Sequence, residues 1–170
     1  MPAAPDLLVV YGTLRSGTGW RERLGVADLV QSVGSCTLHG SLFELGWYPG
    51  LVLDGAGPVV AEVLRLREPS VLTTFDRFEG FDPTQPEAGE YRRLLLEIDL
   101  LAIDVAETDV AETDVAETDV AEIDVLDRDR PRPRRAAAWV YALRVAPIDR
   151  PRVVGGDWLA HTGGRTSGPR

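Results

Sequence analysis

Two places in this chain of 170 residues carry side chains or backbone groups suited to chemistry. The first is the turn Tyr11-Gly12-Thr13-Leu14-Arg15-Ser16-Gly17, which follows the apolar run Leu7–Val10. Glycine allows close approach to the backbone and positive φ angles, and a strand that feeds such a turn presents several N–H groups together, which can bind an anion or a carbonyl oxygen. Glycine turns are common, so the local sequence alone favours a plain strand-to-helix turn over a binding site.

The second place is Glu79, at the end of a helical pattern that begins after Ser70, a predicted N-cap, and stops at Gly80. Leu72, Phe75 and Glu79 share one stripe of this helix, so the carboxylate projects inward from the last turn. Burial and the negative end of the helix dipole both raise the pKa of a carboxyl group, which suits proton transfer near neutral pH. Position alone favours the alternative, a solvated glutamate at a helix end.

The elements around these two places are mostly strands. Alternating or continuous apolar runs predict strands over Val30–Thr37, Leu38–Phe43, Leu51–Leu53, Val59–Leu66, Tyr91–Leu100 and Ala136–Val145. A short helical turn is expected between Thr18 and Val26, ending at Gly25. Pro49 and Gly50 suit the two central positions of a type II turn.

The composition bounds the class of protein. With 44% hydrophobic and 26% charged residues, the chain is expected to form one globular domain with a substantial core. Cys36 is the single cysteine, so no internal disulfide forms and no cysteine cluster indicates a metal. The first residues lack the features of a secretory signal, and no stretch is apolar for long enough to span a bilayer, so we expect a cytoplasmic protein without a membrane segment.

The net charge of −9 is concentrated in one segment. Eleven acidic residues and no basic ones lie between Glu97 and Asp124, and the rest of the chain has 16 acidic residues against 18 arginines, a net charge of about +2. Binding of nucleic acid needs clustered positive charge, and with the rest of the chain nearly neutral we expect no nucleic-acid partner. The sequence gives no indication of the oligomeric state.

The acidic segment contains Val-Ala-Glu-Thr-Asp three times from Val105 to Asp119, within a stretch that separates two predicted hairpin strands. A repeat of five residues does not place the valines on one face, either in a helix or in a strand. We predict a mobile acidic loop at 102–135, with docking of a basic partner as an alternative. Loop closure depends only weakly on length, so deleting Val105–Ala121 is expected to change the melting temperature little; a large change would indicate that the insert disrupts the fold of this copy.

The turn at Tyr11 is followed by further motifs in a fixed order. They are Gly40-Ser41-Leu42-Phe43 with Tyr48-Pro49-Gly50, Phe75-Asp76-Arg77-Phe78-Glu79-Gly80, Tyr91-Arg92-Arg93, Trp139-Val140-Tyr141 and Gly155-Gly156-Asp157-Trp158. This ordered set resembles the gamma-glutamylcyclotransferase-like family, also described as AIG2-like, from about Leu7 to Trp158. The resemblance implies an α+β fold: a small, mixed β-barrel-like sheet with a few short helices. We predict a single domain over residues 7–160 and a disordered tail at 161–170.

The resemblance also implies a reaction, in which a small-molecule γ-glutamyl amide is cleaved by attack of its own α-amine, giving 5-oxoproline and a free amine. This chemistry needs no cofactor and no metal. Glu79 is the implied general acid/base. The implied substrate-binding residues are Tyr11, Gly12, Thr13, Leu14 and Tyr91, with packing of Tyr91 on the barrel as an equal alternative.

Tyr141, Arg15 and Cys36 are three other residues with functional groups. Tyr141 is a weaker candidate for substrate contact. Arg15 could pair with a substrate carboxylate, but arginines next to turns are common on protein surfaces, so it is not included in the predicted site. Cys36 is expected in the core. The implied enzyme has one alternative of another class, a non-catalytic module that binds a small carboxylate or a partner in the same cavity. An intact Glu79 beside the Tyr11–Leu14 turn favours the enzyme.

Overall fold

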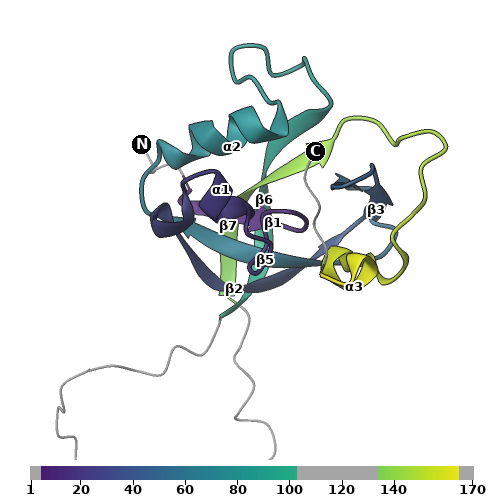
Figure 1. Cartoon of the computed structure of the whole chain (residues 1–170), viewed down its shortest axis with the longest axis horizontal. Coiled ribbons are helices and arrows are strands. Elements are labelled where there is room, and N and C mark those ends of the chain that lie inside the picture. The colour runs from purple at the N-terminus through teal and green to yellow at the C-terminus, as the bar shows by residue number, and fades with distance from the viewer. Residues whose placement is uncertain (1–4, 103–133, 165–170) are drawn as a thin grey trace, which may run out of the picture.

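The computed structural model describes residues 5–102 and 134–164, and its centre is a closed barrel of five strands (Figure 1). The strands follow one another around the barrel in the order β1, β5, β2, β6, β7. Their bounds are Leu7–Val10 for β1, Val30–His39 for β2, Pro58–Leu66 for β5, Tyr91–Ala102 for β6 and Arg134–Leu143 for β7. Neighbouring strands pair antiparallel except β1 and β7, which are parallel. The predicted α+β fold with a small mixed barrel is confirmed.

A separate two-stranded sheet, β3 (Ser41–Glu44) with β4 (Pro49–Val52), lies beside the barrel near α3 (Figure 1). The prediction of a turn centred on Pro49 and Gly50 was wrong. Both residues belong to β4, and the turn comes before them, closed by a hydrogen bond from the Leu45 N–H to the Tyr48 carbonyl (3.0 Å). The first position of a strand tolerates proline, and Gly46 supplies the positive φ of +111° that the turn requires.

Three short α-helices and two 3₁₀ turns complete the described chain. They are α1 (Trp20–Arg23), η1 (Ala27–Leu29), α2 (Val71–Glu79), η2 (Val154–Gly156) and α3 (Trp158–Thr162). As expected, α2 ends at Gly80, which has a left-handed φ of +67°. The predicted capping by Ser70 was wrong, because its hydroxyl bonds the Glu68 carboxylate (3.3 Å) and makes no hydrogen bond to the helix.

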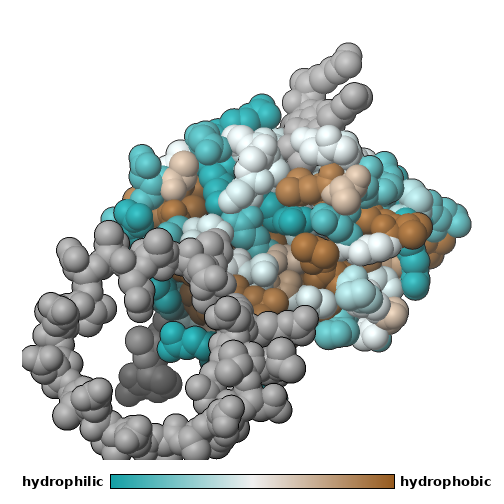
Figure 2. All heavy atoms as spheres, turned by 90° about the horizontal axis from the view of Figure 1, so that it is seen from below, coloured by the Kyte–Doolittle hydropathy of each residue, from teal (hydrophilic) through white to brown (hydrophobic). Residues whose placement is uncertain are grey.

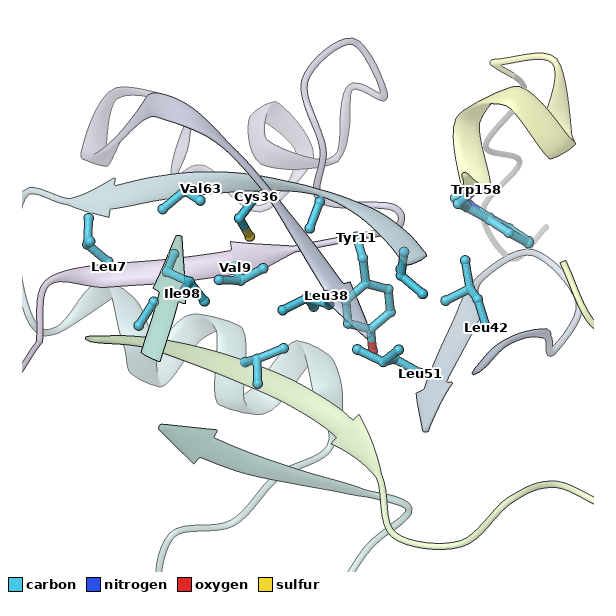
Figure 3. Packing of buried hydrophobic residues seen from close by; sticks show 14 of the residues in the cluster. Leu7, Val9, Tyr11, Cys36, Leu38, Leu42, Leu51, Val63, Ile98 and Trp158 are labelled. Atoms are coloured by element: carbon cyan, nitrogen blue, oxygen red, sulfur yellow. The ribbon is translucent and has the colours of Figure 1, made fainter. Parts of the chain in front are cut away.

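Two apolar clusters hold the fold together, one inside the barrel and one between the barrel and its helices. Val9, Val63 and Ile98 converge in the interior (Figure 3). Leu64 points the other way and packs with Phe75 of α2, which lies above the strands in Figure 1. Each fully buried aliphatic side chain contributes about 1.5–3 kcal/mol. The barrel therefore fixes α2, and with it the end of the helix where Glu79 lies.

The chain after the barrel is held by the Gly-Asp-Trp element. Asp157 accepts hydrogen bonds from the N–H groups of Leu159 and Ala160 and so caps α3, while Trp158 is fully buried and lies beside Leu42 (Figure 3). The predicted tail begins too early, because α3 continues through His161 and Thr162. The acidic repeat and residues 165–170 lie outside the described residues, so the predictions about them are untested.

Seen from below in Figure 2, hydrophobic residues appear at separate places between hydrophilic ones. Large exposed apolar residues of the described chain are Val60, Leu95, Leu101, Val145, Ile148 and Val154. Single exposed apolar side chains are common on folded proteins. In the part of the chain that the structure describes, no helix combines the length and apolarity needed to cross a membrane.

Candidate active site

A cavity of about 280 Å³ opens where the end of β1, the end of α2, the β3–β4 connection and the start of β6 meet. The residues predicted from the sequence for the site all line it: Tyr11, Gly12, Thr13, Leu14, Glu79 and Tyr91. They come from three distant parts of the chain. A cavity of this size is of the order that small-molecule sites occupy.

The turn after β1 is closed by one backbone hydrogen bond, from the Arg15 N–H to the Gly12 carbonyl (3.1 Å). Among the described residues, no hydrogen bond occupies the N–H groups of Gly12, Thr13 or Leu14. A Cβ on residue 12 would overlap the Pro49 ring, with Cδ only 2.7 Å away. Gly12 therefore admits Pro49 to the turn, whereas the sequence had suggested close approach of a ligand.

An ion pair between Arg21 and Glu62, which the sequence did not predict, holds this turn in place. Arg21 donates from Nε to the Leu14 carbonyl (2.7 Å) and from Nη2 to Glu62 (2.8 Å). Glu62 also accepts from the backbone N–H and the hydroxyl of Ser16 (2.7 and 2.6 Å). Burial acts to raise the pKa of Glu62, but the hydrogen bonds from Ser16 and Arg21 outweigh it and hold the pKa below its usual value. The turn is thus fixed before any ligand binds.

Arg15 also serves the scaffold. Its Nη1 lies 2.7 Å from the Asp157 carboxylate, the same group that caps α3, and its side chain is 15% exposed. The suggestion that Arg15 pairs with a substrate carboxylate is therefore not supported, because its charge is already matched by Asp157. The pair connects the turn after β1 to α3.

Glu79 lines the cavity from the last turn of α2 and is half-buried, since one side of it faces the cavity. Within the described residues, its carboxylate has no ion-pair or hydrogen-bond partner. Burial raises the pKa of Glu79 to about 8. A carboxyl group with such a pKa both accepts and donates protons near neutral pH.

Three buried phenols line the cavity around Glu79, and each donates its proton to a protein group. The Tyr11 hydroxyl donates to the Tyr141 carbonyl (2.8 Å), Tyr91 to the Pro49 carbonyl (3.1 Å) and Tyr141 to Asp76 (2.7 Å). Burial raises the pKa of all three hydroxyl groups, and the charge of Glu79 adds to the effect. Tyr91 lines the cavity and is held against β4 by this hydrogen bond, while its contact with a substrate stays a prediction.

Asp76 is the second carboxylate on α2, and sequence reasoning missed it. It is 5% exposed and accepts two hydrogen bonds from Nη1 of Arg93 (2.8 and 2.6 Å) besides the one from Tyr141. The Arg93 guanidinium also stacks over the rings of Phe81 and Trp139. Asp76 stood in one quoted motif and Arg93 in another, but nothing local in either motif predicts their pairing.

Three half-buried rings, Trp47, Tyr48 and Phe78, form another side of the cavity. Trp47 and Tyr48 lie in the connection between β3 and β4, which the sequence predicted only as a turn, and Phe78 lies on α2. The positions of Trp47 and Tyr48 follow from the hairpin that places Tyr48 directly before β4, and that of Phe78 from the packing of α2 on the barrel.

The described residues contain no group of three or more histidine, cysteine or acidic residues arranged to hold a metal. His39 is exposed on β2, and His161 bonds Glu44 (2.9 Å) away from the cavity. Cys36 lies in the core, as predicted, and burial raises the pKa of its thiol to about 12.

Comparison with known proteins agrees with the motifs. The family model described as "Gamma-glutamyl cyclotransferase, AIG2-like" matches residues 8–160. No curated protein matches the sequence significantly.

Solved structures with the same fold come from bacteria and a mammal. An AIG2-like protein from Mus musculus has 18% identity and a TM-score of 0.53, over 85% of this chain and 82% of that one. YkqA from Bacillus subtilis has 20% identity and a TM-score of 0.52. The match covers 94% of this chain but only 41% of the YkqA chain, so this chain spans less than half the length of YkqA. The protein c4763 of uropathogenic E. coli has 16% identity and a TM-score of 0.50, over 95% and 98% of the two chains. At these identities the likeness concerns the fold.

Proposed function

Because the chain belongs to the gamma-glutamyl cyclotransferase, AIG2-like family, we propose that it cleaves a small-molecule γ-glutamyl amide and releases 5-oxoproline and a free amine. The observation that carries this proposal is the carboxyl of Glu79, which has no partner among the described residues and shares one cavity with N–H groups of the turn after β1 that are equally without a partner there. A binding module gains nothing from a half-buried carboxyl without a partner, whose charged form is costly.

In the proposed reaction Glu79 moves one proton. Its carboxylate takes a proton from the substrate α-amine as that nitrogen attacks the γ-carbonyl carbon, which closes the five-membered ring. The bond from the same carbon to the amide nitrogen then breaks, and Glu79 returns the proton to the departing nitrogen. A pKa of about 8 suits both steps, because it lies close to the pKa of an amine.

The backbone of the turn after β1 supplies the electrostatic part of the mechanism. As the α-amine attacks, negative charge develops on the γ-carbonyl oxygen, and preorganised N–H donors stabilise such charge. We assign this role to the N–H groups of Gly12, Thr13 and Leu14, and assign Tyr11 and Tyr91 to positioning the glutamyl part. Glu62 and Arg21 hold the donors in place, so little reorganisation is needed when charge develops.

The test is release of 5-oxoproline from a panel of γ-glutamyl amides by the purified full chain and by Glu79→Gln. Release by the wild type, and its loss in a variant with an unchanged circular dichroism spectrum, would support the enzyme and the role of Glu79. Equal release by both proteins would exclude Glu79 as the acid/base. If no amide is turned over but 5-oxoproline raises the melting temperature, the cavity binds a small carboxylate without catalysis, and the proposed reaction is wrong.

A further inference from the structure

The cavity changes in character from its inner to its outer part. Its innermost aromatic residues are almost sealed from solvent: Tyr11, Tyr91 and Tyr141 are 7%, 4% and 3% exposed. The rings of Trp47, Tyr48 and Phe78 line the same cavity but are only half-buried. Since the glutamyl part of the substrate is assigned to the turn and the inner phenols, these outer rings, which we name the aromatic wall, face the remaining part of the substrate.

The aromatic wall is held rigidly by packing within itself and against α1. The Trp47 ring stacks on Trp20 of α1, with centroids 5.0 Å apart and planes 20° apart. Tyr48 and Phe78 meet Trp47 edge-on, at 5.0 and 6.5 Å. These are preferred geometries for aromatic pairs. The Arg23 guanidinium also packs on the Trp20 ring, 4.5 Å from the ring centroid. The rings of the aromatic wall are therefore held in position before a substrate binds.

The charged residues at the rim of the cavity do not favour an ion of either sign. Arg77 and Glu90 both line the opening, both are exposed, and their charges are opposite. A carboxylate or an ammonium on the departing amine would thus meet attraction from one of them and repulsion from the other. An uncharged ring, in contrast, would bury apolar surface against the wall and stack on it.

We propose that the aromatic wall of Trp47, Tyr48 and Phe78 selects γ-glutamyl amides whose amine side is a neutral aromatic group, such as an arylalkylamine. This inference rests on the proposed function, because it assigns the departing amine of that reaction to the outer cavity. The aromatic group stacks beside Trp47 while the γ-glutamyl part occupies the turn and the inner phenols. The reaction itself is unchanged, and the amine leaves with the proton that Glu79 returns to it.

The first test compares kcat/KM for three γ-glutamyl amides that differ only in the amine: the benzylamide, the similarly sized cyclohexylmethylamide and the methylamide. We expect the benzylamide to exceed the methylamide by tenfold or more and to exceed the cyclohexylmethylamide by several-fold. Equal values for benzylamide and methylamide would overturn the inference. Equal values for the benzyl and cyclohexylmethyl compounds would overturn the aromatic class.

Variants then assign the preference to the wall. In Trp47→Leu the ratio of benzylamide to methylamide is expected to fall about fivefold or more, and Trp47→Phe is expected to restore most of it. Trp139→Leu is the matched control, since it makes the same substitution at a ring that does not line the cavity and should keep the wild-type ratio. An unchanged ratio in Trp47→Leu, or an equal fall in Trp139→Leu, would contradict the assignment.

A binding measurement separates this inference from the reaction on which it rests. Calorimetric titration of Glu79→Gln with the benzylamide and the methylamide reports recognition without turnover. Tighter binding of the benzylamide, by tenfold or more, would support the aromatic wall even if the wild type released no 5-oxoproline. Equal binding of the two amides by Glu79→Gln, or no binding of either, would overturn the role of the aromatic wall. If the wild type then released 5-oxoproline from both amides at equal rates, the proposed function would still stand.

Discussion

The region around Asp76 and the region around Glu79 belong to the same helix, three residues apart, yet they treat a carboxylate in opposite ways. Asp76 is buried with Arg93 and Tyr141 as partners. Glu79 lies in the cavity without a charged or hydrogen-bonded partner among the described residues, and burial raises its pKa to about 8. The comparison teaches that partners, rather than burial alone, decide whether an inward carboxylate stabilises this fold or stays available for chemistry.

Glu62 on β5 is a third carboxylate to compare with Asp76 and Glu79. It too is inside the structure, but Ser16 and Arg21 donate to it and keep it charged. Ser16 belongs to the turn after β1, and Arg21 of α1 also donates to the Leu14 carbonyl of that turn, so Glu62 and its partners hold the turn in position. Glu62 and Asp76 therefore stabilise the surroundings of the cavity, Glu62 by holding the turn after β1 and Asp76 by accepting the Tyr141 hydroxyl proton, whereas Glu79 faces the cavity itself.

The strongest test of the difference is to make the same change at both positions of α2. Glu79→Gln is expected to lower kcat for 5-oxoproline release by about 10²–10⁴-fold, because it removes the proton-transfer group while keeping the shape. Asp76→Asn is expected to lower kcat far less, since Asp76 acts only by holding Tyr141 and Arg93 in place. Release assays with both variants at matched folded concentrations would check this. A loss of kcat in Asp76→Asn as large as in Glu79→Gln would remove the distinction.

Stability should show the opposite ranking. Asp76→Asn leaves the Arg93 guanidinium, 17% exposed, without its counter-charge, and breaking such a pair from one side is expected to cost about 2–4 kcal/mol. For a chain of this size the melting temperature would fall by about 5–12 °C. Asp99→Asn is the matched control: Asp99 pairs with Arg135 at 3.7 Å, and both side chains are largely exposed, so its loss should change stability by less than about 1 kcal/mol. Equal destabilisation by the two variants would contradict the role given to Asp76.

The elements that carry the site could be predicted from the sequence because their signals are local. The apolar run Leu7–Val10 before a glycine turn gave β1 and its turn, and helical spacing that stops at Gly80 gave α2 with Glu79 facing inward. The barrel was predicted as a fold from ordered motifs. Only alternation along each strand was visible directly, and the pairing of β1 with both β5 and β7 was not.

The support behind the site could not be predicted, because it depends on contacts between distant segments. Arg21 and Glu62 are 41 residues apart, and Asp76 and Arg93 are 17 apart, so no local pattern distinguishes them from surface charges. Pro49 illustrates the reverse error. The local Pro-Gly pair indicated a turn, but antiparallel pairing with β3 placed the proline at the start of β4. Tertiary pairing prevailed over the local signal.

The raised pKa of Glu79 predicts that the site destabilises the fold at alkaline pH. The folded state keeps the proton up to about pH 8, whereas the unfolded state releases it near its ordinary pKa of about 4.5. Stability contributed by this group is therefore complete below about pH 4.5 and is lost as pH rises to about 8. Glu79→Gln should accordingly be more stable than the wild type at pH 8.5–9, by about 1–3 kcal/mol, with the difference shrinking towards pH 5. Thermal melts of both proteins across this range would check it, and a variant less stable than the wild type at pH 9 would show that Glu79 has a partner in solution.

Gly12 offers the smallest and most local test of how the cavity is built. An added Cβ meets the Pro49 ring, and the Pro49 carbonyl accepts a hydrogen bond from the Tyr91 hydroxyl. Gly12→Ala should therefore displace Pro49 and Tyr91, two residues that line the cavity, together. We expect a stability loss of about 1–2 kcal/mol and a several-fold fall in kcat/KM, measured by denaturant unfolding and 5-oxoproline release. Gly57→Ala is the matched control, since the nearest atom to its new Cβ would be 3.9 Å away and no strain follows. If Gly12→Ala behaved like Gly57→Ala, the turn after β1 would be free to shift away from Pro49, and its N–H groups would not be the preorganised donors that the mechanism requires.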